Sequence, residues 1–206
     1  MAGRFITFEG IDGAGKSTHL DTAVAQLRTH GLEVVLTREP GGSEMAETLR
    51  QWLLTRSMDA NTELLLMFAA RADHLAQVIR PALQRGAWVV CDRFTDSTLA
   101  YQGGGRQLDE RQILQLAEMV HADCRPERTY FFDLDPVTAQ ARREASRDAD
   151  RFEAEQLAFF ERVRAVYQRL ASAEPARIMT LDSARPLAQV AAQLLADLDD
   201  QVRRFG

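Results

Sequence analysis

The sequence predicts an α/β fold in which a five-stranded parallel sheet lies between two layers of helices. The main observation is that short apolar runs alternate with segments of helical periodicity along the whole chain, which is typical of strand-helix-strand units. A glycine-rich loop between the first apolar run and the first helical segment supports the same prediction. Neither an internal repeat nor a linker interrupts the pattern, so we expect one domain over residues 1–206.

Five apolar runs are the candidate strands: Phe5–Phe8, Val34–Leu36, Ala87–Cys91, Thr129–Phe132 and Arg177–Leu181. The predicted helices begin after Ser17, at Ser43, at an Asn61 cap, at an Asp109 cap, at Pro136, near Glu153 and before Leu187. The helix capped by Asn61 is expected to end at Gly86. The carboxyl ends of parallel strands share one edge of a sheet, where ligands bind. We therefore expect the residues that follow the first three strands to meet there.

The composition excludes several classes of protein. A net charge of −5 argues against a non-specific nucleic-acid binder. Two isolated cysteines and four scattered histidines match no metal-site spacing. The first residues lack the apolar core of a signal peptide, and no apolar run is long enough to span a membrane. We expect a cytoplasmic protein without nucleic-acid or membrane partners.

The segment Gly10–Thr18 fits the pattern G-x-x-x-x-G-K-[ST] of a phosphate-binding loop, or P-loop. Glycines let the backbone turn several N–H groups toward one polyphosphate. Lys16 is expected to reach the outer phosphates, and Ser17 to bind Mg²⁺. A purely structural glycine-rich turn is the alternative.

Lysine usage supports the P-loop. Of 25 basic residues in the chain, 24 are arginines, and the single lysine is Lys16. A compact ammonium group thus stands only where a planar guanidinium does not fit the loop. Coding bias can explain the excess of arginine, but not the position of the exception.

A carboxylate and several arginines follow the later strands. Asp92 ends an apolar run, where P-loop proteins place a carboxylate near the water shell of Mg²⁺; capping the next segment is the alternative. Arg38 and Arg93 are candidate phosphate clamps. Arg71 follows Phe68 by three residues, and without further context a surface arginine beside a core aromatic is the favoured interpretation.

An arginine-rich segment from about 142 to 151 is a further candidate phosphate clamp. If it is helical, Arg143, Arg147 and Arg151 share one face, which is repulsive unless an anion neutralises it. A solvated face, with Glu144 and Asp148 as local partners, is the alternative.

Four stretches together resemble the thymidylate kinase family, and the match covers nearly the whole chain. They are Gly10–Thr18, Thr37–Gly42, Asp92–Phe94 with Ser97 and Tyr101–Arg106, and an arginine-rich lid that ends in Asp150–Glu153. The resemblance implies a P-loop kinase fold and Mg²⁺-dependent transfer of the γ-phosphoryl group of ATP to the 5′-phosphate of dTMP. It also implies dTDP as product, a place in dTTP biosynthesis, and a homodimer.

The resemblance carries roles to individual residues. It implies ATP binding by Gly10, Ile11, Asp12, Gly13, Ala14, Gly15, Lys16, Ser17 and Thr18. It implies dTMP binding by Asp12, Arg38, Glu39, Arg50, Phe68, Arg71, Arg93, Ser97, Thr98, Tyr101 and Gln102. The implied catalytic groups are Lys16, Arg38, Asp92, Arg93, Arg143, Arg147 and Arg151. The implied metal contacts are Ser17, Asp92 through water, and Glu153.

Within that set, Phe68 is expected to stack on thymine and Arg71 to contact its carbonyl edge. Ser97 and Gln102 are expected to read the base, and Tyr101 to crowd the 2′ position of the sugar. The P-loop lacks the arginine that some members carry there, so the transition-state arginine is expected to come from the lid.

Three other functions remain open. The acceptor can be another nucleoside monophosphate or a deoxynucleoside. A GTP-dependent switch needs a second lysine in an N-K-x-D motif, which this chain lacks. A nucleotide sensor without catalysis is the third alternative, and the arginine clamps argue against it.

Overall fold

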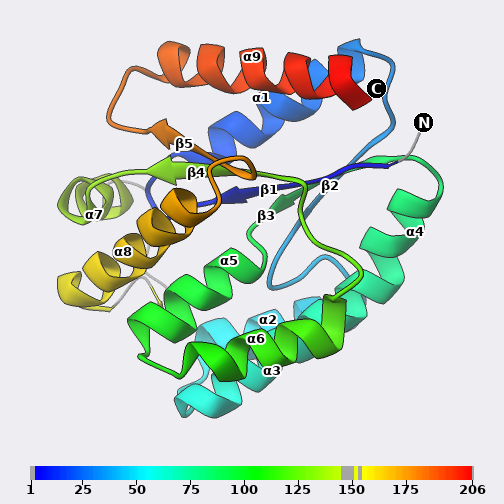
Figure 1. Ribbon diagram of the computed structural model, residues 1–206. Coiled ribbons are helices and arrows are strands. Elements are labelled where there is room, and N and C mark those ends of the chain that lie inside the picture. Colours follow the sequence, from blue (N-terminus) through cyan, green and yellow to red (C-terminus); the bar gives the residue numbers. More distant parts are fainter. Residues whose placement is uncertain (1–2, 145–150, 153–154, 206) are drawn as a thin grey trace.

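The computed structural model describes residues 3–144, 151–152 and 155–205. Its centre is a five-stranded sheet in the order β2-β3-β1-β4-β5, with every neighbouring pair parallel (Figure 1). The strands are β1 (Phe5–Glu9), β2 (Val34–Arg38), β3 (Trp88–Asp92), β4 (Arg128–Asp133) and β5 (Ile178–Asp182). The predicted α/β class and the parallel sheet are confirmed.

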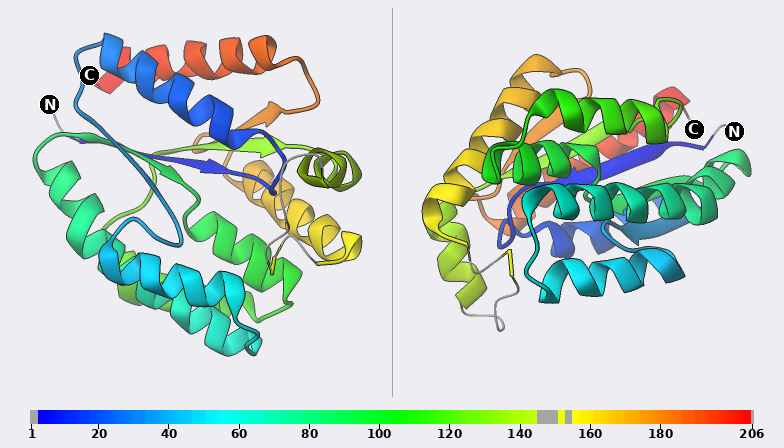
Figure 2. Two further views of the ribbon diagram at one scale, coloured as in Figure 1. Left: turned by 180° about the vertical axis from the view of Figure 1, so that it is seen from behind. Right: turned by 90° about the horizontal axis from the view of Figure 1, so that it is seen from below.

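Helices cover both faces of this sheet. Their bounds are α1 (Lys16–Thr29), α2 (Glu44–Thr55), α3 (Ala60–His74), α4 (Arg80–Gln84), α5 (Thr95–Thr98), α6 (Glu110–His121), α7 (Pro136–Glu144), α8 (Leu157–Ala173) and α9 (Leu187–Phe205). Figure 2 shows α1 and α9 side by side on one face, with α2 to α6 and α8 on the other. The chain therefore has the three layers that the sequence predicts.

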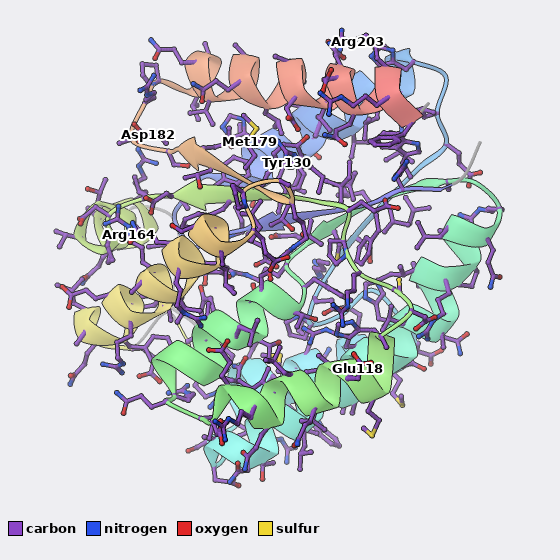
Figure 3. All side chains as sticks on the ribbon, in the orientation of Figure 1. Glu118, Tyr130, Arg164, Met179, Asp182 and Arg203 are labelled. Carbon is purple, nitrogen blue, oxygen red and sulfur yellow. The ribbon has the colours of Figure 1, made fainter. Side chains whose placement is uncertain are left out.

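The central strands β1, β3 and β4 are buried on both faces, which explains their continuous apolar runs, whereas the edge strands β2 and β5 are only partly buried. One hydrophobic cluster, with Phe8 and Phe132 at its centre, extends under α1 and α9. A second, smaller cluster packs Phe5 against Leu75 and Phe94. Tyr130 and Met179, labelled in Figure 3, are paired neighbours on β4 and β5. The core thereby fixes the strand ends that carry the candidate site.

Helix α3 differs from the prediction in two ways. Its cap is Asp59 rather than Asn61, since Asp59 Oδ1 accepts from the backbone N–H groups of Asn61 and Thr62, both at 3.0 Å. The Asp59 carboxylate precedes the first turn and can accept from its free backbone N–H groups, whereas the Asn61 side chain already belongs to that turn. The helix also widens into a π-helical segment, Leu75–Ile79, before α4, instead of running unbroken toward Gly86.

None of the helices within the described residues is long and apolar enough to cross a lipid bilayer.

Replacing Leu194 by alanine tests the packing of α9 on the sheet. Its side chain is fully buried, so Leu194→Ala leaves a cavity and should lower the free energy of unfolding by about 2–5 kcal/mol. Leu187→Ala on the same helix removes a side chain that is 59% exposed, so the free energy of unfolding should change by less than about 0.5 kcal/mol. Urea unfolding measures both, and equal effects would contradict this packing.

Candidate active site

Three parallel strands deliver their following residues to one edge of the sheet. The backbone N–H of Glu39, just after β2, donates to the carbonyl of Asp92 at 2.9 Å. The N–H of Arg93, just after β3, donates to the carbonyl of Phe8 on β1, also at 2.9 Å. These bonds hold the ends of β1, β2 and β3 together, as the sequence predicts for a parallel sheet.

The loop between β1 and α1 has the backbone of a phosphate cradle. Gly10, Gly13 and Gly15 have φ angles of 138°, 85° and 88°, in the region that favours glycine. A Cβ on Gly10 would lie 2.6 Å from the carbonyl oxygen of Phe132, so only glycine fits against β4. Ile11 and Ala14 are buried, and Ser17 and Thr18 are exposed in the first turn of α1.

Lys16 is folded back onto this loop. Its ammonium donates to the carbonyls of Gly10 at 3.0 Å and Ile11 at 3.3 Å, and its side chain is nearly buried. Burial, followed by the charge of Arg93, lowers the pKa of Lys16. The ammonium group therefore lies at the rim of the cradle, where the outer phosphates of a nucleotide would meet it.

Arg93 connects the P-loop to the neighbouring side chains. Its φ is 71°, an uncommon value for a residue other than glycine. Its guanidinium donates to Asp12 Oδ1 at 2.8 Å and to the hydroxyls of Tyr101 at 3.2 Å and Tyr167 at 3.3 Å. Although burial opposes ionisation of Asp12, Arg93 and Lys16 outweigh it and hold the Asp12 pKa below its usual range. Asp12 is thus the counter-ion that fixes Arg93.

Glu9, at the end of β1, lies behind Arg93 and is fully buried. It accepts from the backbone N–H of Phe94 at 2.7 Å, from Ser97 Oγ at 2.5 Å and from the hydroxyl of Tyr167 at 2.9 Å. Burial, and then the charge of Asp96, raises the pKa of Glu9 to about 7. The hydroxyl hydrogen of Ser97, expected to read a base, is therefore used by Glu9.

Arg71 on α3 has one guanidinium nitrogen without a partner among the described residues. Its Nε donates to Glu39 Oε2 at 2.6 Å and its Nη2 to Thr98 Oγ1 at 2.9 Å, but the buried Nη1 has no hydrogen-bond partner. His74 Nδ1 lies 3.0 Å from the second oxygen of Glu39. Arg71 and then His74 outweigh burial and lower the pKa of Glu39. Glu39 is therefore an anion that orients Arg71.

A cavity lies between these groups and α3. It is lined by Asp12, Arg38, Glu39, Pro40, Arg50, Leu54, Met67, Arg71, Asp92, Arg93, Phe94, Ser97, Thr98, Tyr101, Gln102 and Phe152. Every residue predicted for the acceptor lines it except Phe68. Phe68 is 3% exposed and belongs to the core, and Met67, one residue earlier, takes its place on the wall. Arg71 also contacts Phe68, since its guanidinium carbon lies 4.9 Å from the centre of that ring, but the ring packs in the core and does not line the cavity.

Three other residues predicted for the acceptor bond to protein groups around the cavity. Arg38 is half-exposed and pairs with Glu47 at 3.0 Å. Arg50 donates to the carbonyl of Pro40 at 2.8 Å. Gln102 donates its amide to Glu63 at 2.8 Å. These contacts hold the three side chains at the rim and wall of the cavity.

Asp92 offers a group that a metal-bound water would satisfy. Its Oδ1 is buried and has no hydrogen-bond partner among the described residues. The carboxylate interacts favourably with the charge of Lys16 at the start of α1. No cluster of three or more histidine, cysteine or acidic side chains forms in the part of the chain that the structure describes. The donors thus fit a hydrated ion held mainly by phosphates and one hydroxyl.

The predicted lid arginines have different outcomes. Arg147 and Glu153 lie outside the described residues, as does the side chain of Arg143 on α7. Arg151 is described, and it donates to Leu53 O at 2.9 Å and Glu63 Oε2 at 2.7 Å. Its guanidinium thus faces α2 and α3.

Sequence reasoning did not assign Glu9, Tyr167 or Phe152 to the site. Glu9 left a signal, since it is a carboxylate at the end of an apolar strand directly before Gly10. Tyr167 left none, because its partners are 70 or more residues away in the chain.

Known proteins resemble this chain over most of its length. The family model of thymidylate kinase matches residues 8–194. This chain belongs to the thymidylate kinase family. A thymidylate kinase from Bordetella pertussis is 55% identical over 203 residues, covering 98% of this chain and 96% of the relative. One from Pseudomonas putida is 57% identical over 193 residues, with 92% of each covered. The crystal structure of thymidylate kinase from Ehrlichia chaffeensis has 34% identity and a TM-score of 0.80, covering 97% of this chain and 99% of the other.

The buried carboxyl of Glu9 gives a prediction about pH. Because its pKa is raised, the folded protein keeps a proton that the unfolded chain releases at about 4.5, so the stability due to Glu9 falls as pH rises from about 4.5 to about 7. The free energy of unfolding of the wild type, relative to Glu9→Gln, should fall over this window by at most ~1.4 kcal/mol per pH unit. Denaturant unfolding at several pH values measures it, and a difference independent of pH would mean that Glu9 stays ionised.

Proposed function

We infer that this thymidylate kinase family member transfers the γ-phosphoryl group of ATP to the 5′-phosphate of dTMP and releases dTDP. The observation that supports this most is the position of Arg93 between the P-loop and the cavity. Its guanidinium pairs with Asp12 of the loop and lines the cavity at the same time. A donor phosphate on the loop and an acceptor phosphate in the cavity would therefore meet at one cation.

The cavity suits a nucleoside monophosphate with a carbonyl-bearing base. We propose that Arg93 and Arg38 hold the acceptor phosphate at the end nearest the P-loop, since arginine forks match phosphate oxygens. At the other end, Nη1 of Arg71 is the donor left over after Glu39 and Thr98 are satisfied. A base carbonyl in front of Nη1 satisfies this buried donor, which an apolar group cannot do.

Met67 and Tyr101 shape the rest of the acceptor site. We propose that the thioether of Met67 contacts the base, since a flexible, polarisable side chain packs well on an aromatic ring. The Tyr101 ring lies with its hydroxyl bonded to Asp12 at 3.1 Å, so it is held rigidly. In this place it would crowd a 2′-hydroxyl and favour a deoxyribose.

The chemistry needs positioned charges rather than a covalent intermediate. Phosphoryl transfer passes through a loose transition state, so catalysis is mostly alignment and neutralisation of charge. Lys16, Arg93 and Arg38 would supply positive charge on both sides of the transferred group. Asp12 keeps Arg93 aimed at it, and burial of the groups strengthens these interactions.

We propose that Mg²⁺ binds with ATP at this site. Ser17, exposed in the first turn of α1, and the partnerless Oδ1 of Asp92 fit the ion and its water shell respectively. When bound, Mg²⁺ neutralises charge on the outer phosphates of the donor.

We also propose a homodimer through α3 and α6. These helices pack together, and Leu65 (57% exposed) on α3 and Met119 (75% exposed) on α6 line the same hollow on their outer face. A second copy would cover this apolar face, as C₂ assembly does in most homodimers.

Sedimentation of the wild type and of Met119→Glu tests the proposed homodimer, and a monomeric wild type would contradict the proposal.

A coupled assay of ATP consumption with Mg²⁺ tests the proposed reaction. Turnover should be high with dTMP and low with dUMP, dCMP, dGMP, AMP and thymidine, and Lys16→Ala should reduce it by at least about 10²-fold without loss of folding. Preference for another acceptor would contradict the base assignment. Nucleotide binding without turnover would favour a sensor.

The wall of the cavity gives a separate prediction. Met67→Ala should raise KM for dTMP by about tenfold or more, because apolar contact worth ~1.5–3 kcal/mol is lost. Phe68→Leu, a core change of similar volume, should cost less than about 1.5 kcal/mol of stability and affect this KM less. A larger KM effect from Phe68→Leu would restore Phe68 as the base platform.

A further inference from the structure

Glu63, in the first turn of α3, gathers side chains from three parts of the chain. Its carboxylate is fully buried. It accepts from Gln102 Nε2 at 2.8 Å, from Arg151 Nη2 at 2.7 Å, and from Arg106 Nε at 3.3 Å to each oxygen. We call these four residues the Glu63 cluster. A buried carboxylate requires such partners, since an unpaired one is strongly destabilising.

Arg151 is held by protein groups on two of its sides. Besides Glu63, its Nε donates to the carbonyl of Leu53 on α2 at 2.9 Å. Its guanidinium carbon lies 4.7 Å from the centre of the Phe152 ring. In the right-hand view of Figure 2, the short yellow segment 151–152 lies beside α2 and α3. These contacts direct the charge of Arg151 at Glu63.

Phe152 joins the Glu63 cluster to the acceptor cavity. The ring lines the cavity and is almost buried. It meets Tyr101 edge-on, with ring centres 6.1 Å apart and planes at 81°. Arg106 approaches its other side, with the guanidinium carbon 5.6 Å from the ring centre. A change in the Glu63 cluster would therefore reach the cavity wall through Phe152.

Together with Glu155, which pairs with Arg106, the cluster has two carboxylates for two guanidinium groups, and this balance opposes reassignment of Arg151 to a phosphate. Arg106 pairs with both Glu63 and Glu155, and Arg151 supplies the shorter contact to Glu63. Moving Arg151 away would leave Glu63 with one guanidinium at 3.3 Å, shared with a second carboxylate. The pairing in place is the more favourable use of Arg151.

We propose that Arg151 is a positioning residue for the acceptor: paired with Glu63, it fixes Phe152 as a wall of the cavity and thereby sets the affinity for dTMP. This inference rests on the proposed function, since it names the same cavity as the dTMP site. It removes Arg151 from the candidates for contact with the transferred phosphoryl group.

Binding of dTMP in the absence of ATP separates the two roles. Arg151→Met keeps an unbranched apolar stem and removes the charged guanidinium. We expect its Kd for dTMP, measured by calorimetry without ATP, to rise about tenfold, equivalent to ~1.4 kcal/mol. The kcat at saturating dTMP should stay within about threefold of wild type. Arg169→Met on α8 is the control. Arg169 is exposed and pairs with Glu110, so its replacement should change neither Kd nor kcat.

A double-mutant cycle with Glu63→Gln tests the route. If Arg151 acts through Glu63, the double variant should bind dTMP no more weakly than the weaker single variant. Multiplying effects on Kd would contradict that route. Thermal unfolding of every variant confirms that the folded protein is being compared.

The outcomes distinguish this inference from the proposed function. If the wild type turns over dTMP while Arg151→Met binds dTMP normally and loses kcat by about 10²-fold or more, Arg151 touches the reacting phosphate and this inference alone is wrong. If the wild type neither binds nor turns over dTMP, the proposed function fails and takes this inference with it.

Discussion

The ion pair between Arg93 and Asp12 joins the two halves of the site. Asp12 belongs to the loop that follows β1, and Arg93 follows β3, the strand beside it. Parallel pairing brings both residues to one edge, and the φ of 71° at Arg93 turns its side chain toward the loop. The same guanidinium reaches Tyr101 and Tyr167, so α8 and the segment after α5 are fixed relative to the P-loop. In the proposed reaction, the relative placement of donor and acceptor would therefore depend on this contact.

Around this pair, the protein orients its arginines with buried or partly buried carboxylates. Glu39 holds Arg71, Glu63 holds Arg151 and Arg106, and Asp12 holds Arg93. Burying a carboxylate without a partner costs free energy, and the cation that each carboxylate orients compensates this cost. Some donors, such as Nη1 of Arg71, are left without a partner among the described residues. The hydrogen bonds of the other nitrogens in the same guanidinium fix their direction. Such preorganisation is what a reaction driven by positioning requires.

The sequence predicted the fold and the meeting of strand ends because both follow from local patterns. Apolar runs, glycines with positive φ and parallel topology need no knowledge of side-chain contacts. Side-chain partners were harder to predict: Ser97 was expected to read a base, yet it donates to Glu9, 88 residues away. Phe68 was assigned through the family resemblance, whereas Met67 lines the cavity wall. The contact of Ser97 is long-range, and no local pattern reports it, whereas the phase of α3 can be inferred from its apolar spacing, since Leu64 and Phe68 stand four residues apart and are both buried.

The central claim is that the cavity beside Arg93 holds dTMP with its phosphate toward the P-loop. A crystal structure of the protein with dTMP tests this most directly. We expect the 5′-phosphate within hydrogen-bond distance of Arg93, a base carbonyl at Nη1 of Arg71, and the ring of the base against Met67. A base at the P-loop, or a phosphate away from Arg93, would contradict the account.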